Sequence, residues 1–225
     1  MKKTMVLLTL GLVASVSMAD TLSPVSADKS DQQLCGSGPI WVGQTSARIG
    51  YDIVSNMGAV YVAVFALPTL PEGETITSAA LMINVLAPQG VFGGEADWNI
   101  DVYGVRSSSS AKVLPADFFE GENDDKATKV IDDFIAVKGD SPAAAGPCKS
   151  GAKEAFGAWL QTLYTGNTPN QAYAVIRLNS DVPFTNYKHK KNPEIQNASR
   201  FLKIGTGDSD AAATRPTLTI TTGPR

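Results

Sequence analysis

Apolar and polar residues alternate along several short stretches of the chain, a pattern typical of half-buried β-strands. In residues 98–105, Trp98, Ile100 and Val102 fall on one side, while Asn99, Asp101 and Tyr103 fall on the other. The run VYVAVFAL at 60–67 is instead continuously apolar and rich in β-branched and aromatic residues, which predicts a central strand. The further strands expected from the same reasoning cover residues 47–54, 76–87, 172–180, 200–205 and 216–223.

A single helix is expected at residues 151–165. Phe156, Trp159, Leu160 and Leu163 follow the i, i+3, i+4, i+7 spacing of an amphipathic helix, and Gly166 is expected to supply its left-handed stop. Strands bounded by turn residues around one helix predict an all-β fold, a jelly-roll-like antiparallel β-sandwich with one α-helix. No repeat or linker divides the chain. We expect one domain at 45–225, preceded by a polar N-terminal arm at 20–44 with a strand near residues 40–42.

The first nineteen residues have the form of a secretory signal peptide. A short cationic start precedes an apolar core, and Ser17 and Ala19 occupy the small-residue positions before a cut. Removal of the segment takes two lysines with it and changes the formal net charge from −3 to −5. The chain is therefore expected to be secreted or held at the cell surface, with no membrane span, since the apolar run is too short to cross a bilayer.

The charged residues exclude some function classes. The acidic balance gives no basic stripe for nucleic acid, and the one basic run, at 187–192, is interpreted as a solvated loop. The only histidine is His189, in that same run, and no GxSxG motif is present for a serine hydrolase. Many carboxylates are present, but their spacing singles out no acid and nucleophile for a glycosidase. The sequence thus predicts a protein that has no catalytic residue, needs no cofactor and is not an enzyme.

Two cysteines remain after export. An even number in an exported chain favours a Cys35–Cys148 disulfide, which would close a long loop; two free thiols are the alternative.

An acidic stretch at 117–125 suggests a structural calcium ion. Asp117, Glu120, Glu122 and Asp124 could supply the several oxygen ligands that calcium requires, although the EF-hand spacing is absent. Two further acids, Asp208 and Asp210, lie in the sequence GTGDSDA. The other interpretation is that these are acidic loops kept soluble by their charge.

The order of these segments resembles a known family. The stretches VFALPTLPEGETITSAALMINV, IDVYGVRSSSS, LPADFF, AWLQTLYTG, YAVIRLNSD and RPTLTITT resemble secreted bacterial β-sandwich domains of the DNRLRE type and related planctomycete and verrucomicrobial surface proteins. The resemblance covers roughly residues 45–222 and rests on short hydrophobic motifs. It implies a non-catalytic extracellular domain, similar to a carbohydrate-binding module, in an adhesive or polysaccharide-degrading context. No binding residue carries over, because the matched positions are core strands. The expectation for this chain departs from the family in two ways. Such modules are usually part of a larger protein and often carry a sorting tail, whereas this chain is expected to stand alone and to have no such tail.

Two functions stay open on this basis. A polysaccharide- or cell-surface-glycan-binding domain would use exposed aromatic and polar residues, and Tyr103 and Tyr173 occupy the polar phase of their strands beside Asp101 and Arg177. Trp41, Tyr187 and Phe92 are further aromatic candidates. The alternative is a self-assembling structural subunit of a matrix or filament, whose arm adds a strand to a neighbouring sheet.

Overall fold

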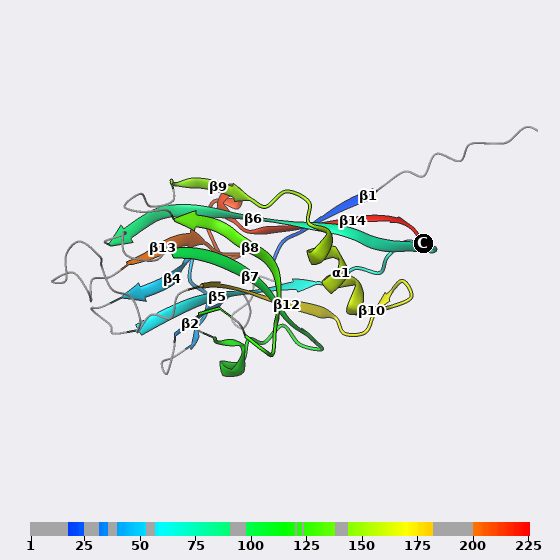
Figure 1. Cartoon of the computed structure of the whole chain (residues 1–225), viewed down its shortest axis with the longest axis horizontal. Coiled ribbons are helices and arrows are strands. Elements are labelled where there is room, and N and C mark those ends of the chain that lie inside the picture. The colour runs from blue at the N-terminus through cyan, green and yellow to red at the C-terminus, as the bar shows by residue number, and fades with distance from the viewer. Residues whose placement is uncertain are drawn as a thin grey trace, which may run out of the picture.

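The computed structural model of the chain describes residues 18–24, 32–35, 40–52, 57–90, 98–119, 121–122, 124–137, 144–181 and 200–225. It is an all-β fold with one α-helix, built on a curled antiparallel sheet (Figure 1). The elements are β1 Met18–Leu22, β2 Gln32–Cys35, β3 Ile40–Trp41, β4 Ser46–Asp52, β5 Met57–Ala66, β6 Glu74–Gly90, β7 Trp98–Ser108, β8 Thr128–Val137, β9 Gly146–Lys149, α1 Glu154–Thr162, β10 Tyr164–Thr165, β11 Thr168–Pro169, β12 Tyr173–Ser180, β13 Arg200–Gly205 and β14 Thr217–Pro224.

Strands β5 and β6 each pair with three strands, which are β2, β4 and β12 for β5 and β9, β13 and β14 for β6. β5 pairs with β12 over Tyr61–Ala66 and with β4 over Met57–Ala59. β6 pairs with β14 over Glu74–Met82 and with β13 over residues 85–90. One end of the sheet continues through β12 and β7 to β8, and the other through β14 to β1. The result is sandwich-like, as the sequence predicts.

The continuous apolar run of β5 is explained by burial on both faces. Tyr61, Ala63 and Phe65 point into the main core between the two parts of the curled sheet. The alternate residues Val60, Val62 and Val64 belong to a second apolar cluster, which also contains Val113 and Val175. Because both faces of the strand are covered, no polar alternation is needed.

Helix α1 packs directly on β6, and glycines make this close approach possible. A Cβ on Gly157 would lie 2.5 Å from the Ser78 Cα, and a Cβ on Gly104 of β7 would lie 2.1 Å from the Trp159 ring. The buried stripe includes Phe156, Trp159 and Leu160, as expected.

The expected helix stop is wrong in one detail. Gly166 is in the left-handed region at φ +64, but the helix ends earlier, at Thr162. Gly166 lies instead in the tight turn of the β10–β11 hairpin, where Thr165 pairs with Thr168.

The segment interpreted as a polar arm contains β2, β3 and the last three residues of β1, with β3 at the expected place; β1 begins at Met18, inside the predicted signal peptide. Among the described residues, no helix is long and apolar enough to cross a bilayer. The side chain of Trp98 and residues Phe92 and Tyr187 lie outside what the structure describes.

The predicted Cys35–Cys148 disulfide is not present, because Cys148 is a free, half-buried thiol. Cys148 lies on β9 opposite Ile83 of β6, whereas the backbone of Cys35 pairs with Ala59 of β5. Strands β13 and β4 separate β6 from β5 along the sheet, so the two cysteines belong to different regions of the fold. Burial raises the pKa of the Cys148 thiol.

Candidate functional site

The polar side of β7 faces a covering segment of the same chain rather than solvent. Residues Asp101 and Tyr103 of β7 lie opposite Asn179 and Arg177 of β12 in the sheet register. All four side chains are buried, with Tyr103 and Arg177 each only 1% exposed. The acidic segment contacts this face through hydrogen bonds from Arg177 and Asn179 to its residues Asp117, Gly121 and Asp124. The four buried side chains of the face, Asp101, Tyr103, Arg177 and Asn179, are here called the buried polar network.

Arg177 is the centre of that network. Its guanidinium donates to the Asn179 Oδ1 at 2.8 Å, to the Asp117 carbonyl at 3.1 Å and to the Asp124 carboxylate at 2.8 Å. It also stacks 4.9 Å from the Tyr103 ring centroid and 5.4 Å from that of Phe119. Burial lowers the pKa of Arg177, and the Asp124 carboxylate counteracts part of this effect. The guanidinium thus binds the covering segment to β12.

Other contacts hold the segment at Asp117 and at Gly121. Arg106 of β7 donates to both Asp117 carboxylate oxygens, at 2.7 and 2.8 Å, and the Leu114 N–H donates to the same carboxylate. The Asn179 amide donates to the Gly121 carbonyl at 2.8 Å. The bidentate pair of Arg106 and Asp117 is geometrically specific as well as strong.

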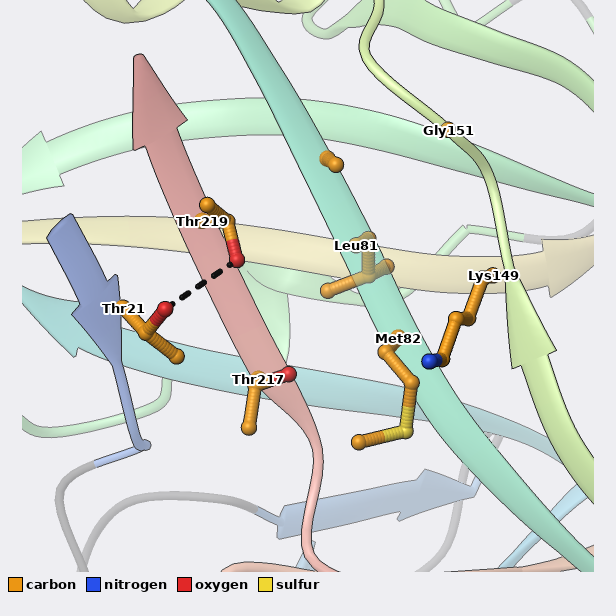
Figure 2. Close-up of a pocket in the computed structure, with 8 residues that line it drawn as sticks. Thr21, Leu81, Met82, Lys149, Gly151, Thr217 and Thr219 are labelled. Carbon is orange, nitrogen blue, oxygen red and sulfur yellow. Dashed lines mark hydrogen bonds between the residues drawn. The ribbon is translucent and has the colours of Figure 1, made fainter. Parts of the chain in front are cut away.

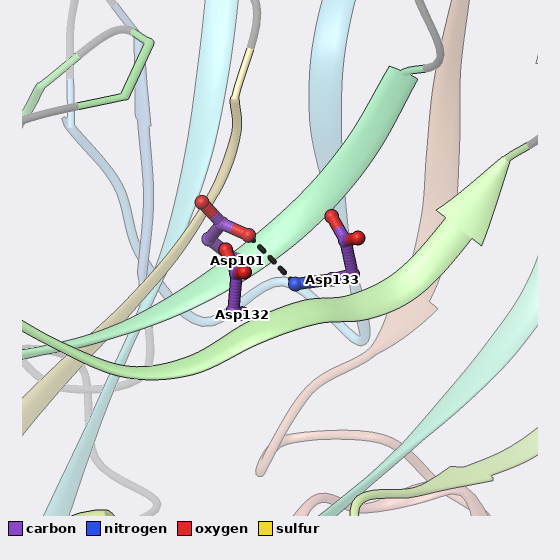
Figure 3. A group of neighbouring side chains, drawn as sticks. All are labelled: Asp101, Asp132 and Asp133. Atoms are coloured by element: carbon purple, nitrogen blue, oxygen red, sulfur yellow. Dashed lines mark hydrogen bonds between the residues drawn. The ribbon is translucent and has the colours of Figure 1, made fainter.

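An acidic cluster lies beside the network, on β7 and β8. The carboxylates of Asp101, Asp132 and Asp133 approach one another closely, and the Asp133 N–H donates to Asp101 at 2.9 Å (Figure 3). Asp133 is held at φ +49, in a region where the β7–β8 register shifts. This bulge turns consecutive aspartates toward one place.

The cation in this cluster is Lys129. Its Nζ lies 2.9 Å from Asp101, 2.7 Å from Glu122 and 2.8 Å from Asp132. Burial alone would lower the pKa of Lys129, but its hydrogen bonds to these three carboxylates raise the pKa overall. The ammonium therefore stays charged and neutralises part of the cluster.

Asp181 has the most clearly perturbed carboxyl pKa of the site. It accepts a hydrogen bond from the Asn99 N–H at 3.1 Å. Burial, with the nearby charges of Asp101, Asp133 and Glu122, raises the pKa of Asp181 to about 6, against the opposing effect of the Asn99 hydrogen bond.

The structure brings three of the four expected ligand-binding residues together but covers them. The expectation that Tyr103 is exposed is wrong, because the residue is only 1% exposed. Asp101 and Arg177 are buried with it. Tyr173 shares that face of β12 and is only half-buried, packed against the second apolar cluster. Trp41 is half-buried on β3.

The acids expected to bind calcium have separate partners. Asp117 pairs with Arg106, Asp124 with Arg177 and Glu122 with Lys129. Glu120 lies outside the described residues. Calcium binding stays a prediction. To bind the ion, Asp117, Glu122 and Asp124 would each have to leave the arginine or lysine with which it pairs, or contact both cations at once.

A groove of about 310 Å³ lies elsewhere, on the sheet formed by β1, β14, β6 and β9. Its residues form cross-strand rows. Thr217, Met82 and Lys149 make one row, and Thr21 and Thr219 begin the next (Figure 2). The register places Ala80 opposite Thr219 in that second row. The hydroxyls of Thr21 and Thr219 are 3.4 Å apart. The lining is completed by Leu81 and Gly151.

Sequence reasoning did not identify this groove. The available signal was the alternation of TLTITT at 217–222, which places Thr217, Thr219 and Thr221 on one side of a strand. Threonines in that phase are also ordinary surface residues of a sheet. Only the pairing of β14 with β1 and β6 brings them beside Met82 and Lys149.

Comparison with known proteins gives no relative from which a function could be transferred: no protein-family model and no curated protein matches the chain.

Proposed function

We propose that this protein is a secreted, non-catalytic domain that binds polysaccharide at a cell surface or in an extracellular matrix, and that the groove beside Thr219 is the binding site. The observation that carries the proposal is the lining of the groove. Threonine hydroxyls and one ammonium lie next to the apolar atoms of Met82 and Ala80. The signal peptide expected at 1–19 and the resemblance to DNRLRE-type domains support the extracellular setting.

The chemistry of the groove suits a sugar. A pyranose ring presents apolar C–H faces and a rim of hydroxyls, so it needs an apolar floor with hydrogen-bonding groups around it. Met82 and Ala80 supply the floor, and Thr21, Thr217, Thr219 and Lys149 supply the rim. Its volume is at the lower end of the roughly 300–1,000 Å³ of small-molecule sites, which suits one or two sugar units of a longer chain.

The part of the groove on β14, β6 and β9 is built on paired strands, and this favours binding. Residues on regular strands keep their relative positions without a ligand, so less ordering entropy is lost when the ligand arrives. By contrast, the buried polar network would need segment 117–124 to detach before a glycan could reach Tyr103 or Arg177. We therefore place binding at the groove and not on that face.

The lining of the groove does not suit glycoside hydrolysis. Glycoside hydrolysis normally requires two carboxyl groups on either side of the scissile bond. Among the described residues that line the groove, none is acidic, and the one charged side chain is Lys149.

The test is a glycan array and polysaccharide pull-down with residues 20–225, run with and without calcium. The variants are Thr219→Val and Lys149→Met in the groove, with Thr168→Val in the β10–β11 turn as a matched control. We expect retention on one polymer class and at least tenfold weaker binding in both groove variants, with the control unchanged.

Other outcomes contradict the proposal in different ways. Loss of binding in Tyr173→Ala, with the groove variants unaffected, would move the site to the half-exposed part of β12. Absence of retention on any polymer, together with large oligomers in the same preparation, would overturn the binding function in favour of a structural subunit.

A further inference from the structure

Strand β1 is the weakly held end of the sheet. Among the described strands it pairs with β14 alone, from Met18 opposite Thr222 to Leu22 opposite Leu218. Met18, Ala19, Asp20 and Thr21 are exposed, and Leu22 is the residue of this strand that packs against the main core. Backbone hydrogen bonds, the Leu22 side chain and the contact between the Thr21 and Thr219 hydroxyls therefore hold these five residues, which is little for a strand. Two residues after the strand, Pro24 is buried and bridges Phe65 of β5, so the chain is anchored again there.

The strand beneath it does not depend on β1. Leu218 and Ile220 of β14 are buried in the main core, and β14 pairs with β6 along its whole length. Removing β1 would leave β14 in place with a free edge. A free strand edge with its N–H and C=O groups unpaired is a template for another strand.

The predicted signal cleavage makes this edge more accessible. A cut after Ala19 removes Met18 and Ala19, whose partners are Thr222 and Thr221. Only Asp20, Thr21 and Leu22 then remain to pair with β14.

We propose that β1 is exchanged between copies of this protein, so that β1 of one subunit pairs with β14 of the next in the register seen here. The occupant is a second copy because its β1 has the same sequence and makes the same contacts. The exchanged contact then differs from the internal one only in how the chain is connected. Assembly is favoured at high protein concentration, where a neighbouring strand competes with the chain's own strand.

Exchange has a consequence for the groove. Thr21 comes from β1 and Thr219 from β14, so the groove lies across the seam between these strands. In an exchanged assembly its lining would be completed by Thr21 of the partner subunit. A ligand that contacts both threonines would hold the donated strand in place, and this consequence alone rests on the proposed function.

The test uses two single-cysteine proteins, residues 20–225 with Cys35→Ser and Cys148→Ser, one carrying Thr21→Cys and the other Thr219→Cys. One protein is labelled with ¹⁵N, and the two are mixed at high concentration, either directly or by joint refolding from urea, and then oxidised. Exchange brings residues 21 and 219 of different molecules into the opposed positions seen here. We expect a disulfide-linked heterodimer, identified by mass spectrometry, at a yield at least tenfold above that of the control pair.

The control pair is Ser108→Cys mixed with Tyr173→Cys, which lie opposite each other on the interior strands β7 and β12. Circular dichroism verifies that each variant is folded. A heterodimer yield equal to that of the control, both in the direct mixture and after joint refolding, overturns the proposal. No glycan is used, so this result and the pull-down succeed or fail independently.

Discussion

The Arg177 Nη2 donates to the Asp124 Oδ2 at 2.8 Å, and the two side chains are only 1% and 5% exposed. This pair joins a central strand to an acidic segment that covers it. The chain's own residues thus cover the polar side of β12 next to β7. The buried polar network holds the acidic segment that contains Asp117 and Asp124 against β12. Its contacts, and the packing elsewhere in the fold, lead to four predictions.

Replacing Asp124 by Ala should destabilise the protein strongly. The substitution leaves the Arg177 cation buried without its carboxylate partner, and breaking a buried ion pair in this way costs about 3–5 kcal/mol. The free energy of unfolding measured by urea denaturation reports this directly. The control is Asp125→Ala, an exposed neighbour, which should change stability by less than about 0.5 kcal/mol. Similar small effects for both variants would show that the pair is not important for stability.

Asp181 should make stability depend on pH. Its pKa in the folded protein is raised to about 6 from an ordinary value of 3.8, so the folded state binds the proton more tightly than the unfolded state. The free energy of unfolding contributed by this group is therefore greatest below about pH 4 and falls as the pH rises through 6.

The variant Asp181→Asn removes this pH-dependent loss. The amide oxygen can still accept from the Asn99 N–H, and no charge is buried at neutral pH. We expect a gain of about 1–2 kcal/mol at pH 7.5 and almost none at pH 4, from urea denaturation at the two pH values. An equal effect at both would exclude Asp181 as the source of the pH dependence.

Two tyrosines should respond in opposite directions to the same substitution. The Tyr61 hydroxyl is buried in the main core and has no hydrogen-bond partner among the described residues, whereas the Tyr103 hydroxyl donates to Asp101 at 3.3 Å. Tyr61→Phe should therefore stabilise by about 1 kcal/mol, and Tyr103→Phe should destabilise by about 0.5–1.5 kcal/mol. Thermal and urea unfolding compare the two. Destabilisation by Tyr61→Phe would reveal a partner for that hydroxyl.

Gly157→Ala should destabilise, although alanine is the better helix former. The new methyl group would lie 2.5 Å from the Ser78 Cα, so α1 would have to move away from β6. Overpacking of this kind costs about 1–3 kcal/mol after the helix preference of up to about 1 kcal/mol is overcome. Ala158→Ser, on the exposed side of the same helix, is the control. Stabilisation by Gly157→Ala would contradict the close packing.

Strands with regular alternation were predictable, but one with bulges was not. The segments that became β5, β6, β7, β12, β13 and β14 were all identified from their pattern. β8 was missed, because its register with β7 shifts and Asp133 adopts a positive φ. Val130 and Ile131 are consequently both buried, although they are adjacent in the sequence. A bulge inserts a residue into the two-residue period on which strand prediction depends.

By itself, the sequence determined the fold class, the single helix and its buried stripe, and which residues lie on the polar side of β7 and β12. These properties depend on local periodicity, and local periodicity is written in the order of residues. The tertiary structure decided that Arg177 is buried and bonded to Asp117 and Asp124, that Cys148 stays free, and that Thr21, Thr219 and Lys149 form one groove. Each of these relationships joins segments far apart in the chain, and such pairings depend on the register and curl of the whole sheet.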